Sequence, residues 1–169
     1  MAAMKKTTKK SPAIYPAEGA AAPAFSAPGS NGKTVKLADY KGKRALVLYF
    51  YPRDNTSGCT KEACGFRDTL GDFNKEKVEI LGVSPDSLNS HSKFIEKYDL
   101  PFVLLADEDH KMAEQYGAWQ EKSNYGRTYM GIARTTFVID KAGKIAKVFK
   151  NVKAAGHHEK VLEWVRENL

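Results

Sequence analysis

A near-continuous apolar run, RALVLYFY from Arg44 to Tyr51, constrains the fold more than any other part of the sequence. Apolar side chains at successive positions are typical of a central strand that is covered on both faces. Two further runs, 77–84 and 101–107, have the same character, and predicted helices at 59–75 and 85–99 separate the three. This alternation predicts two parallel crossovers. We therefore expect an α/β fold with a mixed central sheet and helices on both faces.

The remaining pattern completes this sheet. Residues 22–37 read as short extended pieces around the turn signal Asn31-Gly32, and 112–116 as a short helix. Two strands at 134–140 and 144–150 are joined by a Lys-Ala-Gly turn, and a helix at 157–168 closes the chain. The Gly- and Tyr-rich stretch 117–133 is predicted to be an ordered loop.

The chain of 169 residues predicts a flexible basic arm at 1–20 and one domain at 21–169. Four lysines in the first ten residues supply much of the net charge of +7. We interpret them as a solvated arm rather than a nucleic-acid contact. The arm has no apolar core typical of a secretory signal, and no run reaches the roughly 18 apolar residues of a membrane helix. We therefore expect a cytoplasmic protein without membrane contact.

The chain has two cysteines, Cys59 and Cys64, which follow the first central strand at the start of a predicted helix. Ligands of α/β sheets bind outside the carboxyl ends of the strands, and the unpaired N–H groups of a helix start stabilise a thiolate. In the preceding loop, Pro52 has a fixed φ and can shield the sulfur, and Thr56 offers a hydroxyl that both donates and accepts. Two thiols placed this way indicate catalysis or metal binding rather than a structural disulfide.

Helix geometry separates the two sulfurs. The side chain of Cys64 points about 140° away from that of Cys59, and their Cα atoms lie about 8–9 Å apart along an intact helix. A disulfide needs Cα atoms within about 7 Å, so the two can bond only if the first turns unwind. The alternative is that both are small buried apolar residues. A reactive thiolate with a second thiol that resolves the product fits the polar loop better.

The stretch YFYPRDNTSGCTKEACGFRD resembles the active-site segment of the peroxiredoxins, with their Pro-x-x-x-Thr/Ser-x-x-Cys signature. The four-residue gap to Cys64 is similar to the Q-type or bacterioferritin-comigratory subfamily. The likeness continues in GVSPDS and in YGRTYMGIARTTFVIDKAGKI, and covers the chain from about residue 20. Ser57 stands where the family often has proline.

The resemblance implies a thioredoxin-like fold and an antioxidant thiol peroxidase. It implies that Cys59 attacks hydrogen peroxide or an alkyl hydroperoxide and becomes a sulfenic acid. It implies that Cys64 then forms an intramolecular disulfide after local unwinding, and that thioredoxin or a similar dithiol reduces it. By the same resemblance Pro52, Thr56 and Arg134 surround the reacting sulfur. No cofactor or metal is required, and because the disulfide is intramolecular we expect a monomer.

Three rival functions stay open at this point: a copper-binding thioredoxin-like chaperone, a nucleic-acid binder that uses the basic arm, and a general disulfide reductase. The copper hypothesis lacks the shorter cysteine gap that it needs. The histidines give it no support, because we expect His157 and His158 at a solvated helix start, and His91 and His110 have no ligand-like neighbours by spacing.

Overall fold

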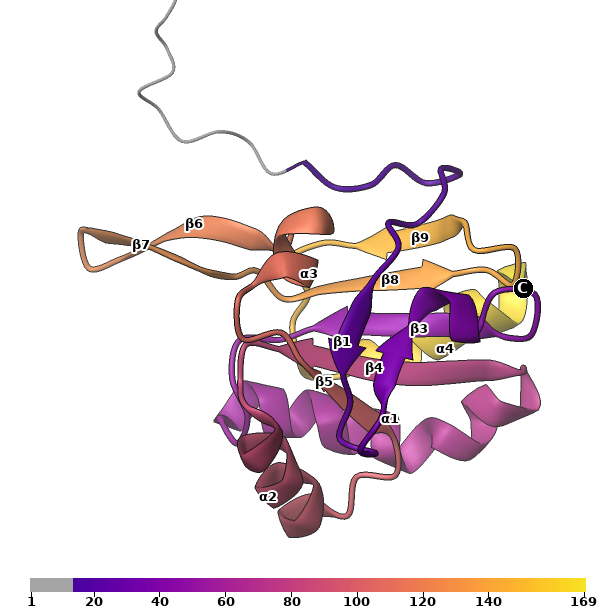
Figure 1. The fold of residues 1–169 in the computed structure, drawn as a ribbon, viewed down its shortest axis with the longest axis horizontal. Coiled ribbons are helices and arrows are strands. Elements are labelled where there is room, and N and C mark those ends of the chain that lie inside the picture. The colour runs from indigo at the N-terminus through magenta and orange to yellow at the C-terminus, as the bar shows by residue number, and fades with distance from the viewer. Residues whose placement is uncertain (1–13) are drawn as a thin grey trace, which may run out of the picture.

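The computed structural model describes residues 14–169, and a five-stranded mixed sheet forms its centre (Figure 1). The strand order is β5-β4-β3-β8-β9. The strands are β3 (Ala45–Phe50), β4 (Val78–Ser84), β5 (Val103–Ala106), β8 (Thr135–Ile139) and β9 (Ile145–Phe149). Strands β3, β4 and β5 run parallel, whereas β8 pairs antiparallel with both β3 and β9. The predicted crossovers and the terminal hairpin are confirmed.

Both faces of the sheet are covered because β3 sends alternate side chains to two cores. Val47 and Tyr49 pack on one face against α1 (Ser57–Lys75) and α4 (His157–Asn168). Leu48 and Phe50 pack on the other face. The elements of that second face are β1 (Ser26–Pro28), β2 (Thr34–Lys36), a 3₁₀ turn (Leu37–Asp39) and α3 (Lys111–Gln115). This is the thioredoxin-like arrangement that the resemblance implied.

Helix α2 (Leu88–Tyr98) lies beside the β5 edge of the sheet, on the side of α1 (Figure 1). Its Phe94 belongs to the same core as Tyr49 and Tyr51. Ser87 caps the helix by accepting a hydrogen bond from the backbone N–H of Ser90, at 3.1 Å. Among the described residues, no helix has the length and apolarity that a membrane crossing requires.

The prediction of a loop at 117–133 is wrong. These residues form an antiparallel hairpin of β6 (Trp119–Asn124) and β7 (Arg127–Ile132), which projects from the body of the molecule (Figure 1). Its turn places Tyr125 at φ 52° and Gly126 at φ 77°, the two positive values of a type I′ turn. The hairpin escaped prediction because its strands are largely exposed and polar, and the turn carries Tyr-Gly instead of Asn-Gly.

The histidine pair at the start of α4 is not solvated as predicted. His157 is 2% exposed, and its Nε2 lies 2.7 Å from the Thr136 hydroxyl on β8. His158 lies against the backbone of α1 at Gly65, where a side chain would overlap its ring. Helix α4 therefore approaches α1 closely, because residue 65 has no Cβ.

Residues 1–13 of the predicted arm lie outside the described residues. The rest of the arm runs along β9. The backbone N–H of Gly19 donates to the Ile145 carbonyl at 2.7 Å, and the Glu18 carboxylate accepts from the Val148 N–H at 3.1 Å. The Tyr15 hydroxyl lies 2.5 Å from the Gln120 side chain. The end of the predicted arm thus packs against the domain.

Two glycines of α1 make a matched test of this helix contact. In Gly65→Ala the new Cβ would lie 2.7 Å from Cε1 of His158, so we expect a loss of about 1–3 kcal/mol in the free energy of unfolding. In Gly71→Ala the Cβ meets nothing within 4 Å, so we expect a gain of about 0.5–1 kcal/mol from helix propensity. Urea denaturation of the reduced proteins measures both. Equal shifts in the two variants would contradict the close approach.

Candidate active site

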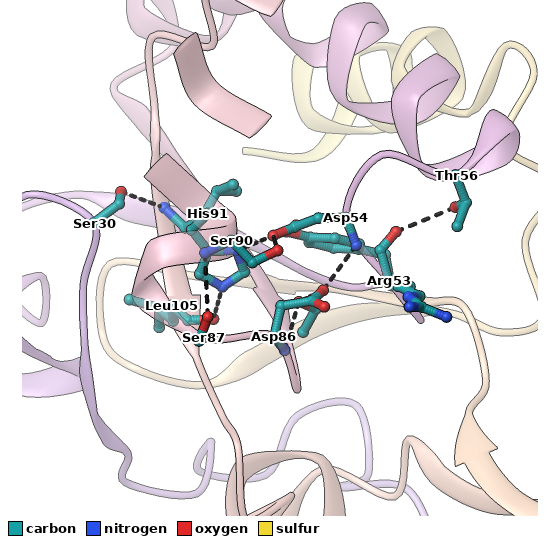
Figure 2. Close-up of polar contacts among 12 residues, drawn as sticks. Ser30, Arg53, Asp54, Thr56, Asp86, Ser87, Ser90, His91 and Leu105 are labelled. Atoms are coloured by element: carbon teal, nitrogen blue, oxygen red, sulfur yellow. Dashed lines mark hydrogen bonds and ion pairs between the residues drawn. The ribbon is translucent and has the colours of Figure 1, made fainter. Parts of the chain in front are cut away.

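A short loop connects β3 to α1 and carries Pro52 and Thr56. Pro52 is half-buried just beyond the strand, and Thr56 is the exposed residue that precedes the helix. The Thr56 side chain does not cap α1. Its hydroxyl instead donates to the Arg53 carbonyl at 3.1 Å (Figure 2). Because this single hydrogen bond is all that holds the hydroxyl within residues 14–169, it can turn toward a ligand at the start of the helix.

Cys59 lies in the first turn of α1, which begins two residues before its predicted start. The residue is 1% exposed and belongs to the core that α1 forms with the sheet. The unpaired N–H groups of the first turn surround this position. The sulfur therefore sits in a site that is dry and electropositive at once.

Arg134, the residue that precedes β8, contacts this sulfur. Its Nη2 donates to Sγ of Cys59 at 3.3 Å. The two residues are far apart in sequence, but the antiparallel register of β3 and β8 places Phe50 opposite Thr135. The residue before β8 thus lies beside the end of β3, where the loop to α1 begins. The structure brings together Arg134 and Cys59, as the resemblance implied.

Glu62 is a site residue that sequence reasoning missed. Its Oε1 accepts from Nη1 of Arg134 at 2.6 Å, and its carboxyl is completely buried. Burial raises the pKa of Glu62 from 4.5 to about 7, and the charge and hydrogen bond of Arg134 limit the rise. The signal was available: an acid three residues after Cys59 lies on the same face of the helix. Glu62 fixes one arm of the guanidinium so that the other points at the sulfur.

Cys64 lies on the same helix but in a different environment. Cys64 is half-buried, whereas Cys59 is buried, and both are free thiols. Helix α1 is unbroken from Ser57 to Lys75, so the expected Cα separation of about 8–9 Å applies. The structure therefore has the reduced arrangement, in which the two sulfurs cannot bond.

A buried polar cluster around Asp54, Asp86 and His91 holds the loop between β3 and α1 in place (Figure 2). The Asp54 carboxylate accepts from the Tyr51 hydroxyl at 2.6 Å, and its Oδ2 lies 2.7 Å from Nδ1 of His91. The backbone N–H of Asp54 donates to Asp86 at 2.7 Å. Sequence spacing gave His91 no such neighbours, because they come from separate elements.

By proximity, Asp54, Asp86 and His91 could bind a metal ion, since one ligand atom of each lies within 4.8 Å of the others. These atoms already satisfy one another, however. Both nitrogens of His91 are in hydrogen bonds, and Oδ2 of Asp86 accepts from both the Asp54 N–H and the Ser84 hydroxyl. A metal ion would have to displace these contacts, so the cluster is a hydrogen-bonded support of the loop.

Comparisons with known proteins agree with this geometry. Residues 19–148 match the model of the AhpC/TSA family. Peroxiredoxin Bcp of Bacillus subtilis (strain 168) is 50% identical over 149 residues, which cover 88% of this chain and 94% of the relative. Peroxiredoxin Bcp of Escherichia coli (strain K12) is 49% identical over 150 residues, which cover 89% and 96%.

A solved structure of the bacterioferritin comigratory protein of Xanthomonas campestris superimposes on this chain with a TM-score of 0.81 and 36% identity. The match covers 85% of this chain and 90% of that one. Structures of that protein as a trapped intermediate or ligand complex bear on its alkyl peroxide reduction activity.

The raised pKa of Glu62 has a consequence for stability. Between pH 4.5 and about 7 the folded chain keeps a proton on Glu62 that the unfolded chain has lost, so this group lowers the free energy of unfolding as the pH rises. The variant Glu62→Gln cannot ionise. Its stability relative to the wild type should therefore increase by roughly 3 kcal/mol across this window.

Urea denaturation of both proteins from pH 4 to 8 measures this difference. The comparison of Glu62→Gln with the wild type is needed because a second group also titrates in this range. Burial lowers the pKa of His157 to about 4, so His157 makes the stability of both proteins rise with pH over much of the same range. A difference between the two proteins that does not change with pH would show that Glu62 ionises normally.

Proposed function

This chain belongs to the AhpC/TSA family, and we propose that Cys59 and Cys64 carry out the thiol peroxidase reaction of its peroxiredoxin relatives. The chain is a thiol peroxidase, and its substrates are peroxides. We assign hydrogen peroxide and alkyl hydroperoxides as the substrates. The alkyl peroxide reduction activity of the Xanthomonas protein supports the second class. The observation that carries the residue assignment is the 3.3 Å contact between Arg134 and the Cys59 sulfur.

In the first step the Cys59 thiolate attacks the distal oxygen of the peroxide. A sulfur–oxygen bond forms, the oxygen–oxygen bond breaks, and the leaving oxygen takes a proton to become water or an alcohol. Arg134 stabilises the thiolate and then the negative charge that develops on the oxygens, and its ion pair with Glu62 keeps it in place. Thr56 orients the peroxide with its hydroxyl, and Pro52 shields the sulfur from water.

In the second step the Cys64 thiol attacks the sulfenic acid on Cys59, and a disulfide and water form. This step requires α1 to unwind. Its first turn is weakly held, because Thr56 gives no side-chain cap and no acidic residue lies in that turn. Gly58 and Gly65 lower the helix propensity of the segment around the two cysteines. The helix is therefore stable enough to assemble the site and weak enough to open.

An external dithiol reduces the disulfide and returns both cysteines to the reduced state. We assign this role to thioredoxin or a similar dithiol protein. The two thiols supply both electrons of peroxide reduction, so the reaction needs no cofactor or metal. Since the resolving cysteine is in the same chain, a monomer in the cytoplasm is sufficient for the whole cycle.

The two cysteines should give distinct defects. Cys59→Ser removes the nucleophile and should abolish peroxide consumption. Cys64→Ser leaves the first step intact, so it should reduce one equivalent of peroxide per chain and then stop at the sulfenic acid. Peroxide consumption with thioredoxin and its reductase, together with mass spectrometry of the product, checks both. Sustained turnover by Cys59→Ser would exclude this mechanism.

The hydroxyl of Thr56 should matter and its methyl group should not. Thr56→Val should slow the second-order oxidation of Cys59 by roughly 100-fold, the usual cost of losing one preorganised hydrogen bond in a transition state. Thr56→Ser keeps the hydroxyl and should retain most of the rate. Stopped-flow fluorescence measures the rates, and urea denaturation should show little change, because this exposed side chain does not cap α1. Equal rates for the two variants would remove Thr56 from the reaction.

A further inference from the structure

Residues 56–66 contain both cysteines and therefore the turns that have to open, and hydrogen bonds to one helix border them on both sides. Before the segment, Asp54 and Asn55 bond to side chains of α2. After it, Arg67 bonds to the backbone at the last residue of α2. Both cysteines lie between these two borders. The segment itself is held by Arg134, which bonds to Cys59 and Glu62.

The first border is a buried hydrogen-bonded link. Oδ2 of Asp54 accepts from the Ser90 hydroxyl at 2.8 Å and lies 2.7 Å from Nδ1 of His91 (Figure 2). Nε2 of His91 lies 2.8 Å from the Leu105 carbonyl. A carbonyl only accepts, so Nε2 carries a proton, and a second proton lies between Nδ1 and Asp54. His91 is wholly buried. The loop is therefore tied through α2 to β5, an edge strand of the central sheet.

The second border is the hydrogen bond between Arg67 and Tyr98, a residue of α2 that also contacts the first border. The Tyr98 carbonyl accepts from Nη1 of Arg67 at 2.8 Å, and the Tyr98 hydroxyl donates to Oδ1 of Asn55 at 3.0 Å. Tyr98 thus touches the chain on both sides of the segment. Neither contact uses a residue between 56 and 66, so both can persist when that segment opens.

We propose that α2 acts as a brace that confines the unwinding to residues 56–66, with His91 as the positioning residue of the first border. This inference rests on the proposed function, because it concerns the opening that joins Cys59 to Cys64. The brace keeps residues 52–55 of the loop, which include Pro52, in place during the opening. Cys59 then returns to the same position against Arg134 once the disulfide is reduced.

Hydrogen exchange with mass spectrometry tests the borders in the wild-type protein. The reduced protein and the protein oxidised with one equivalent of hydrogen peroxide are compared. Protection should be lost within residues 56–66 on oxidation. The Asp54 N–H, which donates to Asp86, and peptides from α2 should keep theirs. Loss of protection that extends through 52–55 or into α2 in the oxidised wild type would overturn the proposal.

Two amide variants at His91 separate its two hydrogen bonds. In His91→Asn the amide nitrogen can take the place of Nδ1 and keep the bond to Asp54. In His91→Gln it can take the place of Nε2, which keeps the bond to Leu105 and loses the one to Asp54. We expect hydrogen peroxide to oxidise Cys59 at least tenfold more slowly in His91→Gln than in His91→Asn, because the loop is misplaced in His91→Gln. In oxidised His91→Gln the loss of protection should extend to residues 52–55.

Two milder variants keep the test decisive if the buried substitutions fail to fold. Ser90→Ala removes one hydrogen bond to Asp54 and should slow Cys59 oxidation and extend the opening in the same direction as His91→Gln. Ser87→Ala removes the cap of α2 without touching the loop, so it should lower stability and leave the oxidation rate and the border unchanged.

Equal rates and borders in Ser90→Ala and the wild type, or a Ser87→Ala defect as large as that of Ser90→Ala, would show that α2 is only a structural helix. Failure of the proposed function looks different. In that case the wild-type Cys59 itself would react with hydrogen peroxide no faster than an ordinary cysteine.

Discussion

The pairing of β3 with β8 is the constraint on which the rest of the site depends. It places Thr135 opposite Phe50 and so brings the residue before β8 to the point where the chain leaves β3 for α1. Arg134 therefore meets the first turn of the helix, with one nitrogen on the Cys59 sulfur and the other on Glu62. A guanidinium held by a buried carboxylate has little freedom to turn away, so the sulfur faces a fixed cation from the start of the reaction.

The same helix has two opposed tasks. It must be intact for Cys59 to lie in its first turn against Arg134, and it must open for Cys59 to reach Cys64. The sequence reconciles the tasks by combining an uncapped start and internal glycines with a firmly packed remainder. Phe73 anchors the later turns in the core, where it is completely buried. The contacts of α2 with Asp54, Asn55 and Arg67 lie outside the segment that opens.

The sequence predicted the central strands, the four main helices and the placement of Cys59, because each has a strong local pattern. It identified Arg134 only through a family resemblance, since an arginine before a strand has no local signal of its own. Periodicity places Glu62 on the same helix face as Cys59, but its pairing with Arg134 is a contact between distant elements. The cluster of Asp54 and His91 also depends on such contacts, which periodicity does not encode. The hairpin β6–β7 was mispredicted because its strands are largely exposed and polar and its turn carries Tyr-Gly. The buried His157 was mispredicted because its environment comes from β8, which packs against it.

The most direct test of the central claim is the reaction of the reduced wild-type protein with one equivalent of hydrogen peroxide. Stopped-flow fluorescence follows the rate, and thiol counting with peptide mapping identifies the product. The account predicts a fast second-order loss of both thiols and a link between Cys59 and Cys64 within one chain. Oxidation at the rate of an ordinary exposed cysteine, or a product without that link, would contradict it.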